Sequence, residues 1–407
     1  MKVLIVPDKF KGTLTAAAAA EAIACGWRKA RPDDQLDLIP MSDGGDGFGE
    51  VVSSQLKARP QLVKSVDAAH RSCTATWWWE PKKKTAIVES AKVIGLAMLP
   101  PGKFHPFELD TFGLGAVLRA AQAKGAKRIL IGIGGSATND GGFGMARALG
   151  WEFLDDGGRP IEEWTGLHGL AEVCPPGVRT AESTRISFGK AMRRVRGAFV
   201  RADLAVRDPS AFGEVLVAVD VQNRLLGAHG ATQVYGPQKG IRPGDFKLAE
   251  RCLIRLASAM KRQFKYDFAR VPGTGAAGGL GFGLLAFLGA SLEPGFNLFA
   301  KLAHLEQRLR GVDLVITGEG EIDKSTLMGK GVGEVARRCA TLKTPCLGLA
   351  GTVPTECRHG SRFVQIHALT DLTSFTQAKT KPAQWLEKLA AEAAAKLRFQ
   401  PPRQAKA

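Results

Sequence analysis

The chain has 407 residues, of which 45% are hydrophobic, and this is enough for a sizeable core and for two domains. Its formal charge of +17 favours anionic partners, and its seven scattered cysteines form no C-x-x-C pair, which argues against a disulfide framework or a zinc site. The apolar run after Met1 is too short for a secretory signal, so we expect a cytoplasmic protein without a membrane partner.

Strand-like and helix-like segments alternate through the first part of the chain. Apolar runs predict strands at residues 3–6 and 36–39, with a helix at 15–28 between them. Residues 74–79 and 85–89 read as two antiparallel strands joined by a lysine turn. Further along we expect a helix at 111–124, a strand at 128–133 and a helix at 142–149.

The second part continues the alternation after a stretch without a clear period, residues 175–213. We expect strands at 215–221, 312–317 and 347–350, and helices at 244–262, 331–340 and 382–397. The uncharged residues 275–292 approach membrane-spanning length, but their glycines favour a loop that leads into a buried helix.

This order of elements predicts the fold class α/β with two domains. A Rossmann-like parallel-sheet domain would be built from both termini, residues 1–66 and 295–398. Residues 67–294 would form an inserted mixed α/β domain, which carries a surface insertion near 178–212.

Three segments place acids or amides among glycines just after a predicted strand, at 42–47, 134–142 and 318–323. Glycines let backbone N–H groups approach an oxygen-rich ligand, whereas carboxylates repel a bare phosphate. A cation must therefore lie between them, and the combination predicts a phosphate site that includes Mg²⁺.

Other segments add basic groups and more glycine. The turn Asp8–Gly12 follows the first strand, so Lys9 and Lys11 can meet a carboxylate or a transferring phosphoryl group. Lys239 is a candidate phosphate contact, and the glycine-rich segment 273–281 can wrap a nucleotide.

Two other functions stay open at this point. Residues 132–137 fit G-x-G-x-x-A, with Asp155 near the place of a ribose-binding acid, so an NAD-dependent oxidoreductase is the main alternative. The arginine-rich residues 178–207 give a weaker alternative, a nucleic-acid-binding protein, although no aromatic residues interleave with the basic ones. A Walker A loop at 318–325 is disfavoured because Asp323 replaces the second glycine and its carboxylate would face the phosphates.

Taken together, the segments 7–12, 42–47, 132–142, 273–281 and 317–323 resemble the bacterial type I glycerate kinase family, in an order and spacing that spans nearly the whole chain. The resemblance implies ATP-dependent phosphorylation of glycerate, usually to 2-phosphoglycerate, by a cytosolic two-domain α/β enzyme. The chain departs from the family pattern at Phe104-His105-Pro106 and at Lys324-Ser325-Thr326.

On this basis we expect glycerate, ATP and Mg²⁺ as partners, no nucleic acid, and a monomer or homodimer. The candidate residues fall into three groups: catalytic Asp8, Lys9, Lys11 and Asp140; metal-binding Asp43, Asp46, Glu319 and Asp323; and substrate- or nucleotide-binding Ser42, Gly44, Gly45, Gly134, Gly135, Ser136, Thr138, Asn139, Lys239, Gly273, Thr274, Gly275, Gly278 and Gly279. Mg²⁺ takes few carboxylates directly, so some of these acids would act through water. Asp8 or Asp140 would accept the proton of the attacking hydroxyl.

Overall fold

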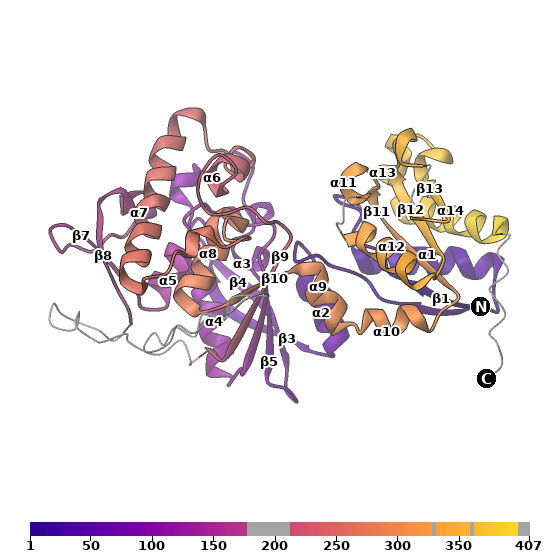
Figure 1. Cartoon of the computed structure of the whole chain (residues 1–407), viewed down its shortest axis with the longest axis horizontal. Coiled ribbons are helices and arrows are strands. Elements are labelled where there is room, and N and C mark those ends of the chain that lie inside the picture. Colours follow the sequence, from indigo (N-terminus) through magenta and orange to yellow (C-terminus); the bar gives the residue numbers. More distant parts are fainter. Residues whose placement is uncertain (177–211, 328–330, 359–361, 398–407) are drawn as a thin grey trace. The chain divides into compact units, whose positions relative to one another are not determined.

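The computed structural model describes residues 1–176, 212–327, 331–358 and 362–397. The chain forms two compact units (Figure 1): unit 1 comprises Met1–Asp43 with Phe296–Ala407, and unit 2 comprises Gly44–Gly295. The predicted fold class, α/β with a parallel-sheet domain built from both termini and an inserted α/β domain, is confirmed.

Unit 1 is built on a five-stranded parallel sheet with the order β13-β12-β11-β1-β2. Its strands are β1 (Lys2–Ile5), β2 (Gln35–Leu38), β11 (Leu314–Glu321), β12 (Cys346–Thr352) and β13 (Gln365–Ala368). The inner strands are continuous apolar runs because helices cover both faces of the sheet.

Helices α1 (Ala16–Ala30) and α14 (Pro382–Lys396) pack together on one face of this sheet, and α12 (Gly331–Leu342) contacts β11 and β12. Thr15 caps α1, since its hydroxyl accepts a hydrogen bond from Ala18 N at 3.1 Å. Unit 1 also contains α10 (Leu305–Arg310), α11 (Lys324–Leu327), α13 (Phe375–Thr380) and most of α9 (Gly295–Leu302).

Unit 2 contains a six-stranded mixed sheet with the order β10-β9-β6-β5-β4-β3. The strands are β3 (Arg59–Val66), β4 (Ser72–Glu80), β5 (Thr85–Glu89), β6 (Arg128–Gly132), β9 (Glu214–Val219) and β10 (Ser291–Pro294). Pairing is parallel from β5 to β10, and antiparallel between β3 and β4 and between β4 and β5, as predicted for the last pair.

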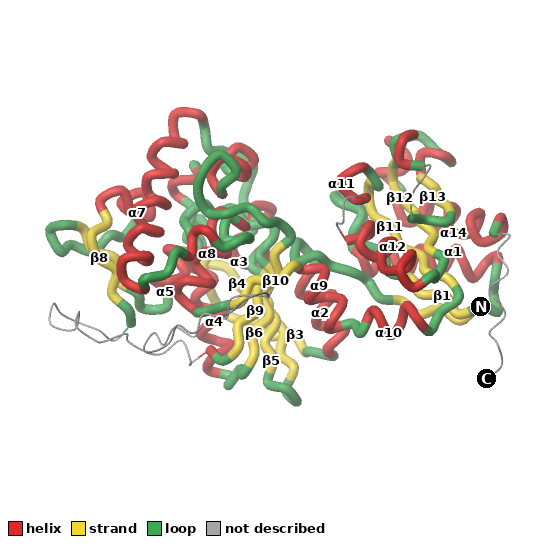
Figure 2. The backbone as a smooth tube through the Cα atoms, in the orientation of Figure 1, coloured by secondary structure: helices red, strands yellow, loops and turns green. Residues whose placement is uncertain are grey.

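Helices and loops cover this second sheet (Figure 2). Helix α2 (Phe48–Leu56) contacts β4 and β5, while α4 (Phe112–Ala123) contacts β3 and β4 and shares the main core cluster with α8 (Ala276–Leu288). The predicted buried helix after the glycine-rich segment is α8. The remaining elements are α3 (Ala91–Ile94), α5 (Phe143–Ala148), β7 (Glu152–Asp155), β8 (Leu170–Cys174), α6 (Ala231–Tyr235) and α7 (Phe246–Phe264).

The structure moves one predicted boundary. Residues 44–66 were expected in the terminal domain, but they belong to unit 2 because β3 pairs along its whole length with β4. The predicted surface insertion near 178–212, with its arginines, lies outside the described residues except for Phe212. All seven cysteines are free thiols.

Candidate active site

Carboxylates gather at the carboxyl edge of the sheet in unit 1. Because β1, β2 and β11 are parallel, the loops that follow them leave the sheet at the same edge, where open α/β sheets bind ligands. Backbone hydrogen bonds join these loops, from Asp8 N to Gly318 O at 2.8 Å and from Met41 N to Pro7 O at 2.9 Å. The structure therefore brings together three predicted segments of the site, 7–12, 42–43 and 318–323.

Asp8 lies inside this group of loops and is only 8% exposed. Burial raises the pKa of Asp8 to about 7, and the negative charges of Asp43 and Glu319 act in the same direction, while Lys9 opposes them. Its Oδ1 also accepts a hydrogen bond from Lys9 N at 2.7 Å. Two carboxylates that act electrostatically on a third favour a proton or a cation among them.

Thr326 holds Glu319 and Asp323, although the sequence analysis noted this residue only as part of a departure from the family pattern. Its hydroxyl donates a hydrogen bond to Glu319 Oε1 at 2.8 Å, and its backbone N donates to Asp323 Oδ1 at 2.9 Å. Hydrogen bonds from Ser325 and Thr326 lower the pKa of Asp323. Thr326 is 2% exposed and so fixes the two acids relative to each other.

The remaining predicted residues of unit 1 differ in exposure. Ser42 is buried, whereas the side chain of Lys11 is exposed on the turn after β1. The backbone of Lys11 passes close to Gly320, where a Cβ would lie 3.2 Å from Lys11 N. The turn that carries both lysines thus packs directly on the acidic segment after β11.

In unit 2, the predicted glycine-rich loops pack against one another at the edge where β6 and β9 end. Gly134 N donates a hydrogen bond to Gly44 O at 3.2 Å, and a Cβ at Gly134 would lie 2.5 Å from Gly45 Cα. A Cβ at Gly278 would lie 1.9 Å from Thr138 O. Only glycine permits these approaches, so the loops at 44–47, 134–142 and 273–281 form one assembly.

Lys239 is buried within this assembly, at the end of the short 3₁₀ helix at Pro237–Lys239. Its Nζ donates hydrogen bonds to Thr138 O at 2.6 Å and to Ser136 Oγ at 3.2 Å. Burial lowers the pKa of Lys239 to about 7, and the charge of Asp140 opposes this effect. A cation placed here at such an electrostatic cost is suited to an anionic ligand.

Two buried side chains of the 134–142 loop have hydrogen-bonding atoms without a partner in the described part of the chain, Thr138 Oγ1 and Asn139 Oδ1. The amide nitrogen of Asn139 donates to Thr232 Oγ1 at 3.1 Å, which fixes the direction of its side chain. Buried polar atoms normally have partners, so these atoms are candidates for contact with a ligand.

Asp140 is completely buried, and both of its carboxylate oxygens accept hydrogen bonds from the protein. Its Oδ2 accepts hydrogen bonds from Thr111 N, Thr111 Oγ1 and Gly144 N at 2.7–2.9 Å, and its Oδ1 accepts one from Gly142 N at 3.3 Å. Burial raises the pKa of Asp140 to about 6, and the charge of Asp110 adds to this. These contacts suit a positioning role, and the catalytic role expected from the sequence stays a prediction.

The predicted segment at 273–279 is tied to the loop after β9. Gly273 N and Gly275 N both donate hydrogen bonds to Asn223 O, and the Thr274 hydroxyl donates to a backbone carbonyl in its own turn. Residues Ala277–Gly279 then have left-handed backbone angles, with φ of 56°, 69° and 86°. This part of the segment shapes the backbone beside Lys239.

Asp46 and Glu89 complete the assembly in unit 2. A Cβ at Gly135 would lie 2.1 Å from Asp46 Oδ1, so this carboxylate rests on the backbone of the 134–142 loop. The NAD alternative requires the pyrophosphate of a dinucleotide to bind at this loop. The negative charge of Asp46 beside the loop disfavours such binding. Glu89, the last residue of β5, was not among the candidate residues predicted from the sequence. Its carboxylate accepts hydrogen bonds from Gly47 N and Gly49 N.

The predicted metal ligands are divided between the units, since Asp43 belongs to unit 1 and Asp46 to unit 2. Among the described residues, no group of three or more His, Cys, Asp or Glu side chains is arranged to hold a metal ion. The metal-ligand set and the number of subunits therefore stay predictions. None of the helices in the described ranges combines the length and hydropathy that a bilayer crossing requires.

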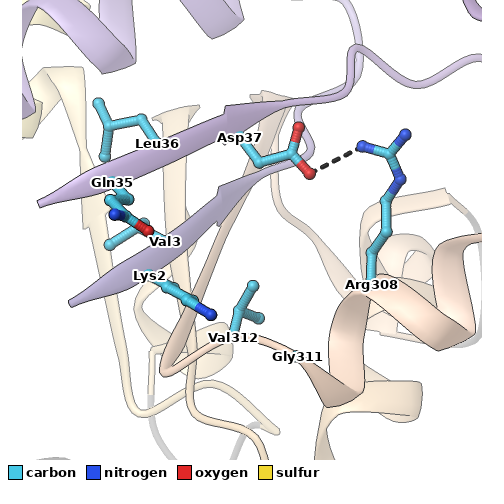
Figure 3. Close-up of a pocket in the computed structure, with 8 residues that line it drawn as sticks. All are labelled: Lys2, Val3, Gln35, Leu36, Asp37, Arg308, Gly311 and Val312. Carbon is cyan, nitrogen blue, oxygen red and sulfur yellow. Dashed lines mark hydrogen bonds and ion pairs between the residues drawn. The ribbon is translucent and has the colours of Figure 1, made fainter.

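A pocket of about 360 Å³ lies elsewhere in unit 1, at the amino ends of β1 and β2 (Figure 3). Its lining includes Lys2, Gln35 and an ion pair between Asp37 and Arg308 at 2.7 Å. It opens at the edge of the sheet opposite the carboxylates, so it is not the candidate site.

Two α/β units with carboxylates and close-packed glycine loops at the carboxyl edges of their sheets are the features of a phosphotransferase. Comparison with known proteins gives the family. The model of the glycerate kinase family matches residues 3–398. A glycerate kinase of Halalkalibacterium halodurans is 35% identical over 86% of this chain and 85% of its own length, and the glycerate 2-kinase of Escherichia coli is 34% identical over 88% and 86%.

A solved structure supports the same conclusion. The crystal structure of a protein described as glycerate kinase 2, from Salmonella typhimurium, matches with a TM-score of 0.76 at 31% sequence identity, and the match covers 97% of each chain. The chain belongs to the glycerate kinase family, and it is an enzyme that phosphorylates glycerate.

Proposed function

We propose that this enzyme transfers the terminal phosphoryl group of ATP, with Mg²⁺, to the 2-hydroxyl of glycerate, so that 2-phosphoglycerate is the product. The choice of the 2-hydroxyl is supported by the similarity to the glycerate 2-kinase of Escherichia coli over 88% of this chain. The observation that carries the proposal is the gathering of Asp8, Asp43 and Glu319 at one sheet edge, beside Lys9.

The donor set in unit 1 fits Mg²⁺, which prefers carboxylate oxygens and takes only one or two of them directly. We assign Asp43 and Glu319 to this role, with Asp323 acting on Glu319 through Thr326. Asp46, which belongs to unit 2, stays a candidate metal ligand on the sequence pattern alone. When bound, Mg²⁺ would neutralise the charge of the phosphoryl oxygens.

Asp8 is our candidate for the group that accepts the proton of the glycerate hydroxyl. It is held in place by a hydrogen bond from Lys9 N, whereas the oxygens of Asp140 already accept four hydrogen bonds from the protein. Lys9 and Lys11 would balance the charge of the substrate carboxylate and of the moving phosphoryl group. Positioning and charge neutralisation would provide most of the rate enhancement.

In unit 2, Lys239, Ser136, Thr138 and Asn139 would bind anionic oxygens, and the glycines of the packed loops would let the ligand approach the backbone. The free hydrogen-bonding capacity of Thr138 and Asn139 supports this assignment. Dry surroundings strengthen the interaction of Lys239 with an anion.

The test is a coupled assay of ADP release over a panel of short hydroxy acids, with and without Mg²⁺. We expect turnover with glycerate that depends on Mg²⁺ and is much weaker with glycolate and lactate. Absence of ADP release with glycerate, or a rate indifferent to Mg²⁺, would overturn the proposal. Titration with NADH, followed by fluorescence, checks the oxidoreductase alternative in the same preparation.

A further inference from the structure

Glu89 is a buried carboxylate at the carboxyl end of β5, 3% exposed. Its Oε1 accepts a hydrogen bond from Gly47 N at 3.1 Å, and its Oε2 accepts one from Gly49 N at 2.8 Å. Gly47 is the N-cap of α2 and has no side chain with which to cap the helix. Glu89, at the end of β5, therefore supplies the hydrogen-bond acceptor that the side chain of a serine or aspartate at the N-cap would normally provide.

The segment that Glu89 holds is fixed on its other side by the 134–142 loop. A Cβ at Gly134 would lie 2.5 Å from Gly45 Cα, and one at Gly135 would lie 2.1 Å from Asp46 Oδ1. Asp46 thus lies between two supports, the glycine loop and the carboxylate of Glu89, which bonds the very next residue. A change at either support should move Asp46.

The surroundings of Glu89 are rich in charge. Lys92 Nζ pairs with Glu50 at 2.7 Å. Burial lowers the pKa of Lys92, but the bond to Glu50 and the negative charges of Glu89 and Asp46 raise it overall. Burial raises the pKa of Glu89 itself, against the opposing effect of its two backbone hydrogen bonds. A buried carboxylate that accepts hydrogen bonds from two backbone N–H groups of a predicted ligand loop can hold that loop in one conformation.

We propose that Glu89 is a positioning residue for phosphoryl transfer, which acts by bonding Gly47 and Gly49 and so holds Asp46 and the backbone before α2 in the reactive arrangement. The inference rests on the proposed function because it takes the reaction to be that of a kinase. Glu89 acts through Asp46 and touches no substrate.

The test compares Glu89→Gln with Glu80→Gln in the full chain. Glu80 is a matched control, because its carboxylate is also buried and accepts two backbone hydrogen bonds, from Lys82 N at 2.8 Å and Lys83 N at 2.7 Å. It lies at the opposite end of the same sheet, beside the start of β5. Both substitutions replace one acceptor oxygen by an NH₂ group, so they should affect stability similarly.

We expect Glu89→Gln to lower kcat about tenfold, to raise the Mg²⁺ concentration for half-maximal rate, and to leave the KM for glycerate nearly unchanged. Glu89→Asp, which keeps the charge but is one methylene shorter, should retain more activity than Glu89→Gln. Glu80→Gln should keep the wild-type kcat. Amide hydrogen exchange of residues 44–49 should become faster in Glu89→Gln alone.

Equal kcat in the two glutamine variants, or unchanged exchange at residues 44–49 in Glu89→Gln, would overturn the role of Glu89. Loss of activity that merely parallels a lower Tm in all variants would overturn it too. A wild-type enzyme without glycerate kinase activity would contradict the proposed function instead, and the exchange measurement would still decide whether Glu89 holds the loop.

Discussion

Replacing the buried Lys239 by methionine should make unit 2 more stable at neutral pH and the enzyme less active. The pKa of Lys239 falls from 10.5 to about 7, mainly because of burial. At pH 7 this fall corresponds to ~4 kcal/mol of lost stability, since each pH unit is worth ~1.4 kcal/mol. Methionine needs no solvation and has a similar volume, so most of this loss should be recovered.

Two hydrogen bonds of Lys239 disappear in the variant, to Thr138 O and Ser136 Oγ. At about 1.5 kcal/mol each, they leave a net gain of about 1 kcal/mol at pH 7. Between pH 7 and 10.5 the unfolded chain binds more protons at Lys239 than the folded one, so wild-type stability rises with pH. The advantage of Lys239→Met should therefore fall by about 2 kcal/mol from pH 7 to pH 9.

Urea unfolding followed by tryptophan fluorescence at pH 7, 8 and 9 measures this difference. Lys247→Met is the control, because Lys247 lies exposed on α7 in the same unit and its replacement should show no such trend. The kcat/KM of Lys239→Met should fall about 100-fold through loss of the buried cation. A stability difference that does not change with pH would refute the reasoning.

Three further substitutions separate the parts of the site. Glu319→Gln should lower kcat at least tenfold and weaken the response to Mg²⁺ in a metal titration, whereas an unchanged response would remove Glu319 from the metal site. Asp140→Asn should lower the free energy of unfolding by about 1–3 kcal/mol, because an amide cannot accept all the hydrogen bonds from Thr111, and an unchanged urea midpoint would contradict its positioning role. Arg308→Ala should leave kcat within about twofold and stability within about 1 kcal/mol, since its pair with Asp37 is exposed and lies at the opposite sheet edge, and a large loss of kcat would place the site there.

Most of the regular elements could be predicted because their apolar periods are strong. The strand expected at 85–89 is observed with the same bounds, and the helix expected at 382–397 ends one residue earlier. The edge strand Arg59–Val66 was not predicted because its residues are largely polar and exposed. Its sequence therefore lacks the apolar alternation that indicates a half-buried strand. This omission also displaced the predicted domain boundary from residue 43 to residue 66.

The loops of the candidate site could be predicted because glycines and acids after a strand are an uncommon pattern. Single residues that lie outside such patterns could not be predicted as parts of the site. Thr326 was noted only as part of a departure from the family pattern and Glu89 only as the end of a strand, because their contacts with Glu319 and Gly47 form only in the folded chain. The burial of Asp140 could not be predicted from the residue type and its neighbours, and the choice between a positioning and a catalytic role for this acid stays a prediction.

Proton-coupled phosphorus NMR of the product formed from glycerate, ATP and Mg²⁺ tests the central claim most directly. The account predicts one new phosphate ester whose signal is a doublet, because the phosphate of 2-phosphoglycerate is attached to a carbon with a single hydrogen. A triplet would show transfer to the primary hydroxyl. No new ester, or the same ester formed without a divalent ion, would contradict the account.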